Sequence, residues 1–156
     1  MTDDVLTFMP ALRALSRILC ESSCDAEDLV QDALLKAIEH IDQYQQGTNM
    51  RAWLFKIMRN RFYSNCRVNA RERTGGLDCV SATPQVDPTQ EWYLRTQEMR
   101  AALQALPDHY RDAIILVGVL GESYLDAADI LECDLGTVKS RVSRARSMLR
   151  CRLEAA

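Results

Sequence analysis

The chain has 156 residues, of which 47% are hydrophobic and 26% are charged, and its formal net charge is -3. This length suffices for one ordinary domain, or two very small ones, around a hydrophobic core. No window approaches the roughly 20 apolar residues of a membrane span, and the acidic start MTDDVLTF is unlike a basic signal peptide. We therefore expect a cytoplasmic protein without a membrane partner. Scarce β-branched runs favour an all-helical fold.

The first 41 residues predict two helices. The pattern VLTFMPALRALSRILC (5–20) tolerates Pro10 near its first turn and aligns three leucines, Leu12, Leu15 and Leu19. Asp25 is the expected N-cap of the next helix, with Asp28 three residues later as in a capping box. The apolar stripe of this helix comprises Val30, Leu34, Ala37 and Ile41. Its outer face is acidic and polar.

A basic helix is predicted after the polar loop 42–49, in MRAWLFKIMRNRFYSNCRVNARER (50–73). Its expected core residues are Met50, Leu54, Ile57, Met58 and Phe62, with Trp53 beside them as an aromatic that braces the helix. Its expected surface residues are Arg51, Arg59, Asn60, Arg61 and Arg67. Residues 74–90, with two glycines and two prolines, predict a flexible linker between two small helical domains.

A helix-turn-helix is predicted near the C-terminus. Ser123 and Asp126 form a capping box for one short helix, and Asp134 caps the next after a turn of about three residues. On a helical wheel the second helix buries one stripe, made of Val138, Val142, Ala145 and Leu149. The opposite side carries Ser140, Ser143, Arg144 and Ser147, flanked by Thr137, Lys139, Arg141 and Arg146. Small polar residues bordered by cations are typical of a helix that reads DNA in the major groove.

Charge is arranged in blocks along the chain. Net charge is -6 over residues 1–49, +6 over 50–73, -8 over 74–135 and +5 over 136–156. A solvated helix face usually mixes signs, because opposite charges four residues apart stabilise it. Two basic helices therefore indicate a polyanionic partner, and nucleic acid is the expected one. The alternative is that both basic faces pair with acidic segments of the same chain.

Enzymatic and metal-binding signatures are missing from the sequence. The six cysteines include no C-x-x-C pair, and His40 and His109 stand at no ligand spacing from them. We expect reduced, partly buried thiols, no metal, no cofactor and no catalytic constellation.

Three motifs together, DAEDLVQD, RAWLFKIMRN and GTVKSRVSRAR, resemble the extracytoplasmic-function (ECF) sigma factors of bacteria, over nearly the whole chain. Within that family, GTNMRAWLFKIMRNRFYS is most similar to the group that drives the general stress response of alphaproteobacteria. The resemblance implies a non-catalytic promoter-specificity subunit of RNA polymerase. It implies a polymerase-docking and −10 domain over 1–73, a linker over 74–90, and a −35 domain over 91–156.

The resemblance also implies roles for individual residues. Those expected to contact the clamp of the largest polymerase subunit are Asp28, Gln31 and Asp32. In the −10 region, Tyr44 and Asn60 are expected to hold an unstacked base. The residues expected to contact the DNA backbone there are Arg51, Arg59 and Arg61. At the −35 element the expected base contacts are Thr137, Ser140, Arg141 and Arg144, and the expected phosphate contacts are Lys139 and Arg146. Further implied partners are the polymerase flap region and an anti-sigma factor that covers both domains.

Two positions depart from the family pattern. Glu122 stands where an apolar or aromatic residue is common, and Leu125 where an acid is common. Two other functions stay open at the level of sequence. One is a sigma-like decoy that binds an anti-sigma factor and no DNA, and the other is a stand-alone helix-turn-helix regulator.

Overall fold

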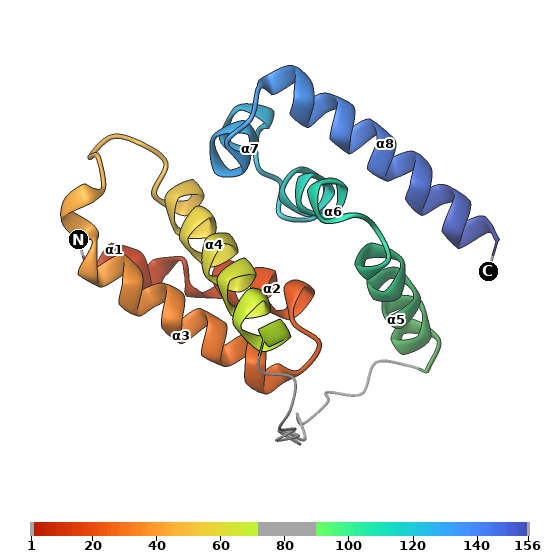
Figure 1. Cartoon of the computed structure of the whole chain (residues 1–156), viewed down its shortest axis with the longest axis horizontal. Helices are drawn as coiled ribbons and strands as arrows, with labels where there is room; N and C mark the ends of the chain where they lie inside the picture. Colours follow the sequence, from red (N-terminus) through yellow and green to blue (C-terminus); the bar gives the residue numbers. More distant parts are fainter. Residues whose placement is uncertain (1, 72–89, 156) are drawn as a thin grey trace. The chain divides into compact units, whose positions relative to one another are not determined.

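The computed structural model describes residues 2–71 and 90–155, which form helices and no strand (Figure 1). These helices divide into two compact units, α1 to α4 and α5 to α8. The predicted all-helical fold with two helical domains is thus confirmed. The predicted linker, 74–90, lies outside the described residues apart from Gln90, where α5 begins. No helix in the described part of the chain is long and apolar enough to cross a bilayer.

In the first unit, α2, α3 and α4 all pack on one another (Figure 1). Its elements are α1 (Thr2–Thr7), α2 (Met9–Leu19), α3 (Ser23–Glu39), the 3₁₀ turn η1 (Ile41–Gln43) and α4 (Met50–Arg71). Fully buried side chains from each of the longer helices meet in its core, among them Leu12, Val30, Leu54, Phe55 and Met58. Burial of such side chains stabilises the unit by about 1.5–3 kcal/mol each, before the entropy cost of ordering them.

The start of the chain differs from the sequence prediction in one respect. The pattern over 5–20 forms two helices, because the backbone breaks at Phe8 (φ -89°, ψ 1°). The break places Pro10 at the second position of α2, where its missing N–H needs no partner within the helix. Pro10 therefore lies in the first turn of a helix, as predicted. That helix is α2, which begins at Met9 and not at the start of the 5–20 pattern.

The N-cap of α3 is Ser22, so the prediction of Asp25 was wrong. The backbone of Ser22 is extended (φ -97°, ψ 148°), and its hydroxyl accepts a hydrogen bond from the Asp25 N–H at 3.1 Å. Asp25 lies in the first turn instead, where its carboxylate stabilises the positive end of the helix dipole. Both residues suit a cap, and the sequence alone could not choose the one at which the backbone turns.

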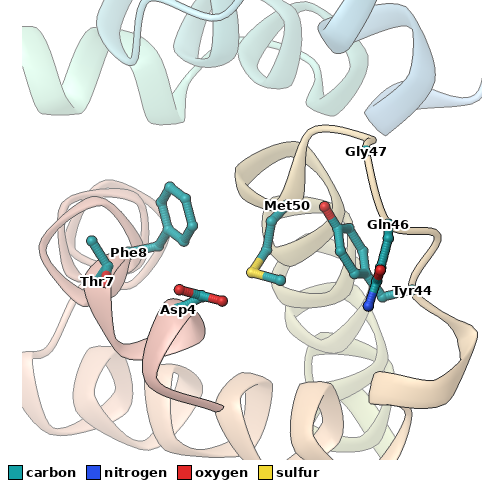
Figure 2. A pocket seen from close by; sticks show the side chains of 7 residues that line it. All are labelled: Asp4, Thr7, Phe8, Tyr44, Gln46, Gly47 and Met50. Carbon is teal, nitrogen blue, oxygen red and sulfur yellow. The ribbon is translucent and has the colours of Figure 1, made fainter. Parts of the chain in front are cut away.

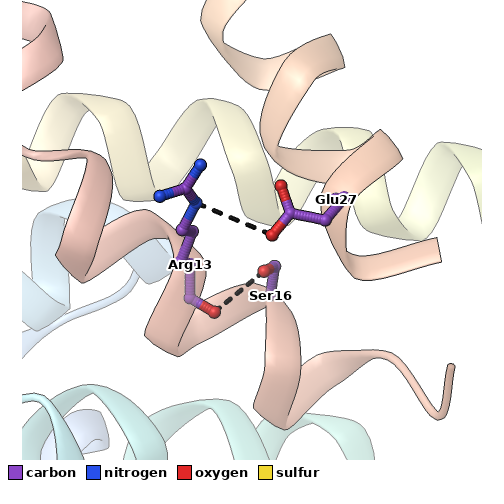
Figure 3. Close-up of polar contacts among 3 residues, drawn as sticks. All are labelled: Arg13, Ser16 and Glu27. Atoms are coloured by element: carbon purple, nitrogen blue, oxygen red, sulfur yellow. Dashed lines mark hydrogen bonds and ion pairs between the residues drawn. The ribbon is translucent and has the colours of Figure 1, made fainter. Parts of the chain in front are cut away.

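A polar contact joins α2 to α3 (Figure 3). Arg13 Nε lies 3.6 Å from Glu27 Oε1 on α3, and both side chains are about half exposed. One turn along α2, the buried Ser16 hydroxyl donates to the Arg13 carbonyl at 2.9 Å. This bond back to the helix satisfies a hydroxyl that would otherwise be buried without a partner.

The core of α4 is shifted from the predicted one. Leu54 and Met58 are buried as expected, whereas Met50, Ile57 and Phe62 are only half-buried. Phe55, which the periodicity did not single out, is completely buried. Because α2 and α3 both pack on α4, the buried face of this helix is wider than one stripe.

In the second unit, shorter helices pack against one side of α8. Its elements are α5 (Gln90–Gln104), α6 (Asp108–Ile114), the π-helical turn η2 (Ile115–Val119), α7 (Tyr124–Leu131) and α8 (Leu135–Glu154). The last helix packs on α5, α6 and α7. Leu103, Leu106, Ile130 and Val138 are among the side chains buried in this core.

The predicted helix-turn-helix is present between Ser123 and Glu154. The Ser123 hydroxyl accepts from the Asp126 N–H at 3.0 Å, which confirms the predicted cap. Glu132 adopts a left-handed conformation (φ 53°) that ends α7, and Asp134 is the N-cap residue of α8 by its backbone, without a side-chain cap bond. The turn between the two helices spans three residues, as expected.

Two further sequence observations can be placed in the structure. The five cysteines among the described residues form no disulfide with one another, and Cys20 is buried; Cys79 lies outside the described residues. At the two unusual positions, Glu122 is buried at 7% exposure, whereas Leu125 on α7 is 70% exposed.

Candidate nucleic-acid interface

The exposed face of α8 carries the residues predicted to read DNA. Val138, Val142 and Ala145 are 1% exposed or less, so they fix which side of α8 meets the unit's core. Leu149, the fourth residue of the predicted stripe, is only half-buried. The opposite side is accessible and polar: Ser140, Ser143, Arg144 and Ser147 are exposed, as are Lys139 and Arg146. Thr137 and Arg141 are half-buried at its edge. Because the buried stripe faces the core, the opposite side of α8 presents serine and arginine side chains to solvent, as the helical wheel predicted.

Two arginines of this face contact the scaffold behind them. Arg144 donates through Nη1 to the Tyr110 hydroxyl on α6 at 3.4 Å. Arg141 donates through Nη1 to Cys133 Sγ, in the turn before α8, at 3.9 Å. Sulfur is a weak acceptor, so the second contact is the weaker of the two. Tyr110 and Arg144 are 34 residues apart, and no local sequence pattern could have joined them.

The basic helix α4 holds two of its cations over aromatic rings. The Arg51 guanidinium carbon lies 5.3 Å from the centroid of the Phe55 ring, and that of Arg59 lies 5.1 Å from the Tyr63 ring. Such cation–π contacts restrict the motion of long side chains. Asn60, directly after Arg59 in sequence, is exposed, whereas Arg51 and Arg59 are half-buried. Of these three predicted −10 residues, Asn60 is the one that the structure exposes most.

Arg61 and Asp32 form an ion pair between α4 and α3. Arg61 Nε donates to Asp32 Oδ2 at 3.2 Å, and the two side chains are 39% and 38% exposed. The sequence assigned Asp32 to the polymerase surface and Arg61 to DNA. The structure brings these two residues together and so links the two predicted surfaces through one contact.

The outer face of α3 is partly apolar. Asp28 and Gln31 are exposed, as the sequence predicted. On the same side of the helix, Leu35 is 60% exposed and Ile38 is 44% exposed. Sequence reasoning missed both, although their spacing of four and seven residues from Gln31 places them on its face. An acidic face with exposed apolar residues is suited to another protein rather than to DNA.

The loop between α3 and α4 is held by aromatic and polar contacts around Tyr44. Its ring lies 5.3 Å from that of Trp53, at an interplanar angle of 50°. Its hydroxyl donates to the Thr48 carbonyl at 2.5 Å. Gly47 has a φ of 92°, a conformation that glycine adopts without strain. Trp53 is half-buried against Tyr44 rather than in the core, so it braces the loop.

A pocket of about 390 Å³ lies beside this loop in the first unit (Figure 2). Its walls are Asp4, Thr7, Phe8, Tyr44, Gln46, Gly47 and Met50. Asn60 is not among them, since it follows Met50 by ten residues, or about 15 Å of helix. The pocket therefore includes only one of the two residues predicted to hold an unstacked base. Within 2–71 and 90–155, no group of three histidine, cysteine or acidic side chains could hold a metal.

Two family models match the chain, one in each unit. Sigma-70 region 2 matches residues 5–72, and Sigma-70, region 4 matches residues 96–149. The chain is 46% identical over 149 residues to the ECF RNA polymerase sigma factor EcfG of Rhodopseudomonas palustris (strain TIE-1), covering 96% of this chain and 82% of that protein. It is 34% identical to the ECF RNA polymerase sigma factor SigE of Mycolicibacterium smegmatis, covering 81% of this chain and 51% of that protein.

Two solved structures are similar over almost the whole chain. One is the sigma factor RpoE in complex with the anti-sigma factor NepR from Bartonella quintana. It has a TM-score of 0.81 and 42% identity, with 97% of this chain and 95% of that chain covered. The other is CnrH in complex with the cytosolic domain of CnrY, with a TM-score of 0.76, 25% identity, and coverage of 98% and 86%.

Proposed function

This chain belongs to the ECF sigma factors of the sigma-70 superfamily, and on that premise we propose that it binds core RNA polymerase and directs it to promoters of stress-response genes. A sigma factor is a transcription initiation factor and not an enzyme. The observation that carries the proposal is the polar face of α8, whose cations and serines lie opposite a fully buried stripe. We propose the polymerase-docking and −10 domain over 1–73, the linker over 74–90 and the −35 domain over 91–156.

The outer face of α3 is the proposed polymerase surface. Asp28, Gln31 and Asp32 supply polar contacts to the clamp of the largest subunit, and Leu35 and Ile38 add apolar area. Buried apolar area supplies most of the affinity of a protein interface, while charged groups at its rim favour the correct partner. The second unit contacts the polymerase flap region.

The loop before α4 and the helix itself are the proposed −10 surface. Tyr44 and Asn60 hold an unstacked base. The cations that face the DNA backbone are Arg51, Arg59 and Arg61. Unstacking a base costs a few kcal/mol, which stacking on an aromatic ring and hydrogen bonds to the base edge offset. The tilted ring contact between Tyr44 and Trp53 supports this role, because it holds the loop in place before DNA arrives.

The face of α8 is the proposed reader of the −35 element. Base-edge contacts come from Thr137, Ser140, Arg141 and Arg144, whereas Lys139 and Arg146 bind phosphates. Serine and threonine are short enough to let the helix approach the groove floor, and arginine can pair with guanine through two hydrogen bonds. Phosphate contacts position the helix without reading sequence.

An anti-sigma factor is the proposed regulator. The similar sigma factor RpoE, at 42% identity, was solved in complex with the anti-sigma factor NepR. The blocked charges of this chain suit such a partner, because an acidic segment can compete with DNA for the basic faces of α4 and α8.

The experiment is transcription in vitro with core RNA polymerase, with and without the purified chain, on a set of promoter fragments. We expect defined start sites only when both proteins are present. A holoenzyme that gains no promoter selectivity over core polymerase would refute the proposed function. A chain that binds the promoter duplex sequence-specifically without polymerase would indicate a stand-alone regulator instead.

A further inference from the structure

The ion pair between Arg61 and Asp32 joins residues that the proposed function assigns to different partners. Arg61 Nε on α4 donates to Asp32 Oδ2 on α3 at 3.2 Å, and the two helices pack on one another. A phosphate of the DNA backbone and the Asp32 carboxylate are both anions, so they compete for the same guanidinium. The chain thus carries its own competitor for one of its proposed DNA contacts.

The pair lowers the attraction of Arg61 for DNA. At 3.2 Å the carboxylate offsets most of the positive charge of the guanidinium for any ion farther away. The affinity of a protein for DNA grows with the number of phosphates that its cations neutralise. Arg61 therefore adds less to DNA binding while it is paired than it would add alone.

The partners of this pair are easy to exchange. The two side chains are 39% and 38% exposed, and exposed ion pairs contribute little to stability because water and salt screen them. A phosphate accepts two hydrogen bonds from one guanidinium, which makes a stronger contact. Little free energy therefore opposes a change of partner once a phosphate lies close to Arg61 and another cation pairs with Asp32.

The outer face of α3 attracts such a cation. Residues 1–49 carry a net charge of -6, and Asp28, one turn before Asp32 on α3, is exposed. Complementary charge favours a basic partner surface on this face. A basic side chain that pairs with Asp32 withdraws the carboxylate from Arg61. Docking of α3 and DNA binding by α4 are then linked through two side chains.

We propose that Asp32 masks Arg61 in the chain alone, and that docking of α3 on a basic surface of the polymerase releases Arg61 to the backbone of the opened promoter strand. This inference rests on the proposed function, which supplies both partners. The linkage is reciprocal, so a bound strand strengthens docking by the same factor by which docking strengthens binding of the strand.

The test measures binding of a fluorescent single-stranded −10 oligonucleotide to the full chain, alone and with core polymerase, with core alone as the reference. Asp32→Asn keeps the shape of the side chain and removes its charge. We expect this variant alone to bind the oligonucleotide about two- to fivefold more tightly than the wild type, the range that a surface ion pair allows. Addition of core should strengthen its binding by a correspondingly smaller factor.

Two further variants separate the pair from a general effect of charge. Glu21→Gln removes an exposed acid of the same unit that belongs to neither proposed surface, so it should strengthen binding less. In an Arg61→Gln background, Asp32→Asn should have no more effect than Glu21→Gln. Thermal unfolding of each variant shows that the unit remains folded.

Failure of the masking and failure of the proposed function give different results. If Asp32→Asn strengthens binding no more than Glu21→Gln, or does so equally with and without Arg61, the masking alone is overturned. Weaker binding by Asp32→Asn would mean that Asp32 orients Arg61 for DNA, which also overturns the masking. If the wild-type chain adds nothing to the affinity of core polymerase for the oligonucleotide, the proposed function fails and this inference fails with it.

Discussion

Arg61 on α4 is hydrogen-bonded to Asp32 on α3 at 3.2 Å, so the proposed DNA surface and the proposed polymerase surface share an ion pair. Each side chain is more than a third exposed, and water and salt screen the attraction between them. The pair orients the two side chains more than it stabilises the fold.

The strength of that pair can be measured with a double-mutant cycle. For Asp32→Ala, Arg61→Ala and the double variant, we expect a coupling of about 0.5 kcal/mol in the free energy of unfolding. The coupling should shrink as salt is added. A coupling above about 2 kcal/mol, or one that salt does not change, would contradict the assignment of a screened surface pair.

Removal of the Tyr110 hydroxyl should reduce the discrimination among base pairs that we propose for Arg144 at the −35 element. Tyr110→Phe keeps the ring and removes the acceptor of a 3.4 Å hydrogen bond. We expect Arg144→Ala to reduce discrimination at one −35 base pair by about 1–3 kcal/mol, and Tyr110→Phe to reduce it at the same base pair by less. Promoter-selection assays with holoenzyme measure both. Lys139→Ala is the control, because loss of a phosphate contact weakens all sequences equally. An effect of Tyr110→Phe at other base pairs would exclude this positioning role.

Leu35 should matter for polymerase binding and not for folding. Its side chain is 60% exposed, so Leu35→Ala should change the free energy of unfolding by less than about 0.5 kcal/mol. Binding to core polymerase should weaken severalfold, and a titration of labelled core measures the change. The control is Leu125→Ala, which alters a 70% exposed leucine of the second unit. Equal loss of binding in both variants would show that α3 has no particular role at the clamp.

Phe55 should be the most sensitive position of the first unit. It is completely buried and carries the Arg51 guanidinium over its ring. Phe55→Ala should destabilise that unit by about 3–5 kcal/mol through lost burial and a cavity. Phe62→Ala, at a half-buried position of the same helix, should cost clearly less. Chemical denaturation, followed by circular dichroism, measures both changes. Similar losses in the two variants would contradict the observed core of α4.

Sequence by itself determined the helical class, the helix-turn-helix and the exposed polar face of α8. Those features follow from periodicity and capping, which act over a few residues. Val138, Val142 and Ala145 repeat at helical spacing, and burial of that stripe leaves only one side of α8 for solvent. The sequence motifs also indicated the family, and the matches to both sigma-70 regions confirm it. The individual contact roles of the predicted residues remain proposals.

Tertiary structure decided what depends on neighbours distant in sequence. It placed the cap of α3 at Ser22, and it buried Phe55 because two helices pack on α4. It also joined Asp32 to Arg61 and Tyr110 to Arg144, and it brought Asp4 to the loop of Tyr44. A helical period states which residues share a face but not which faces meet, because that choice depends on the packing of the whole unit.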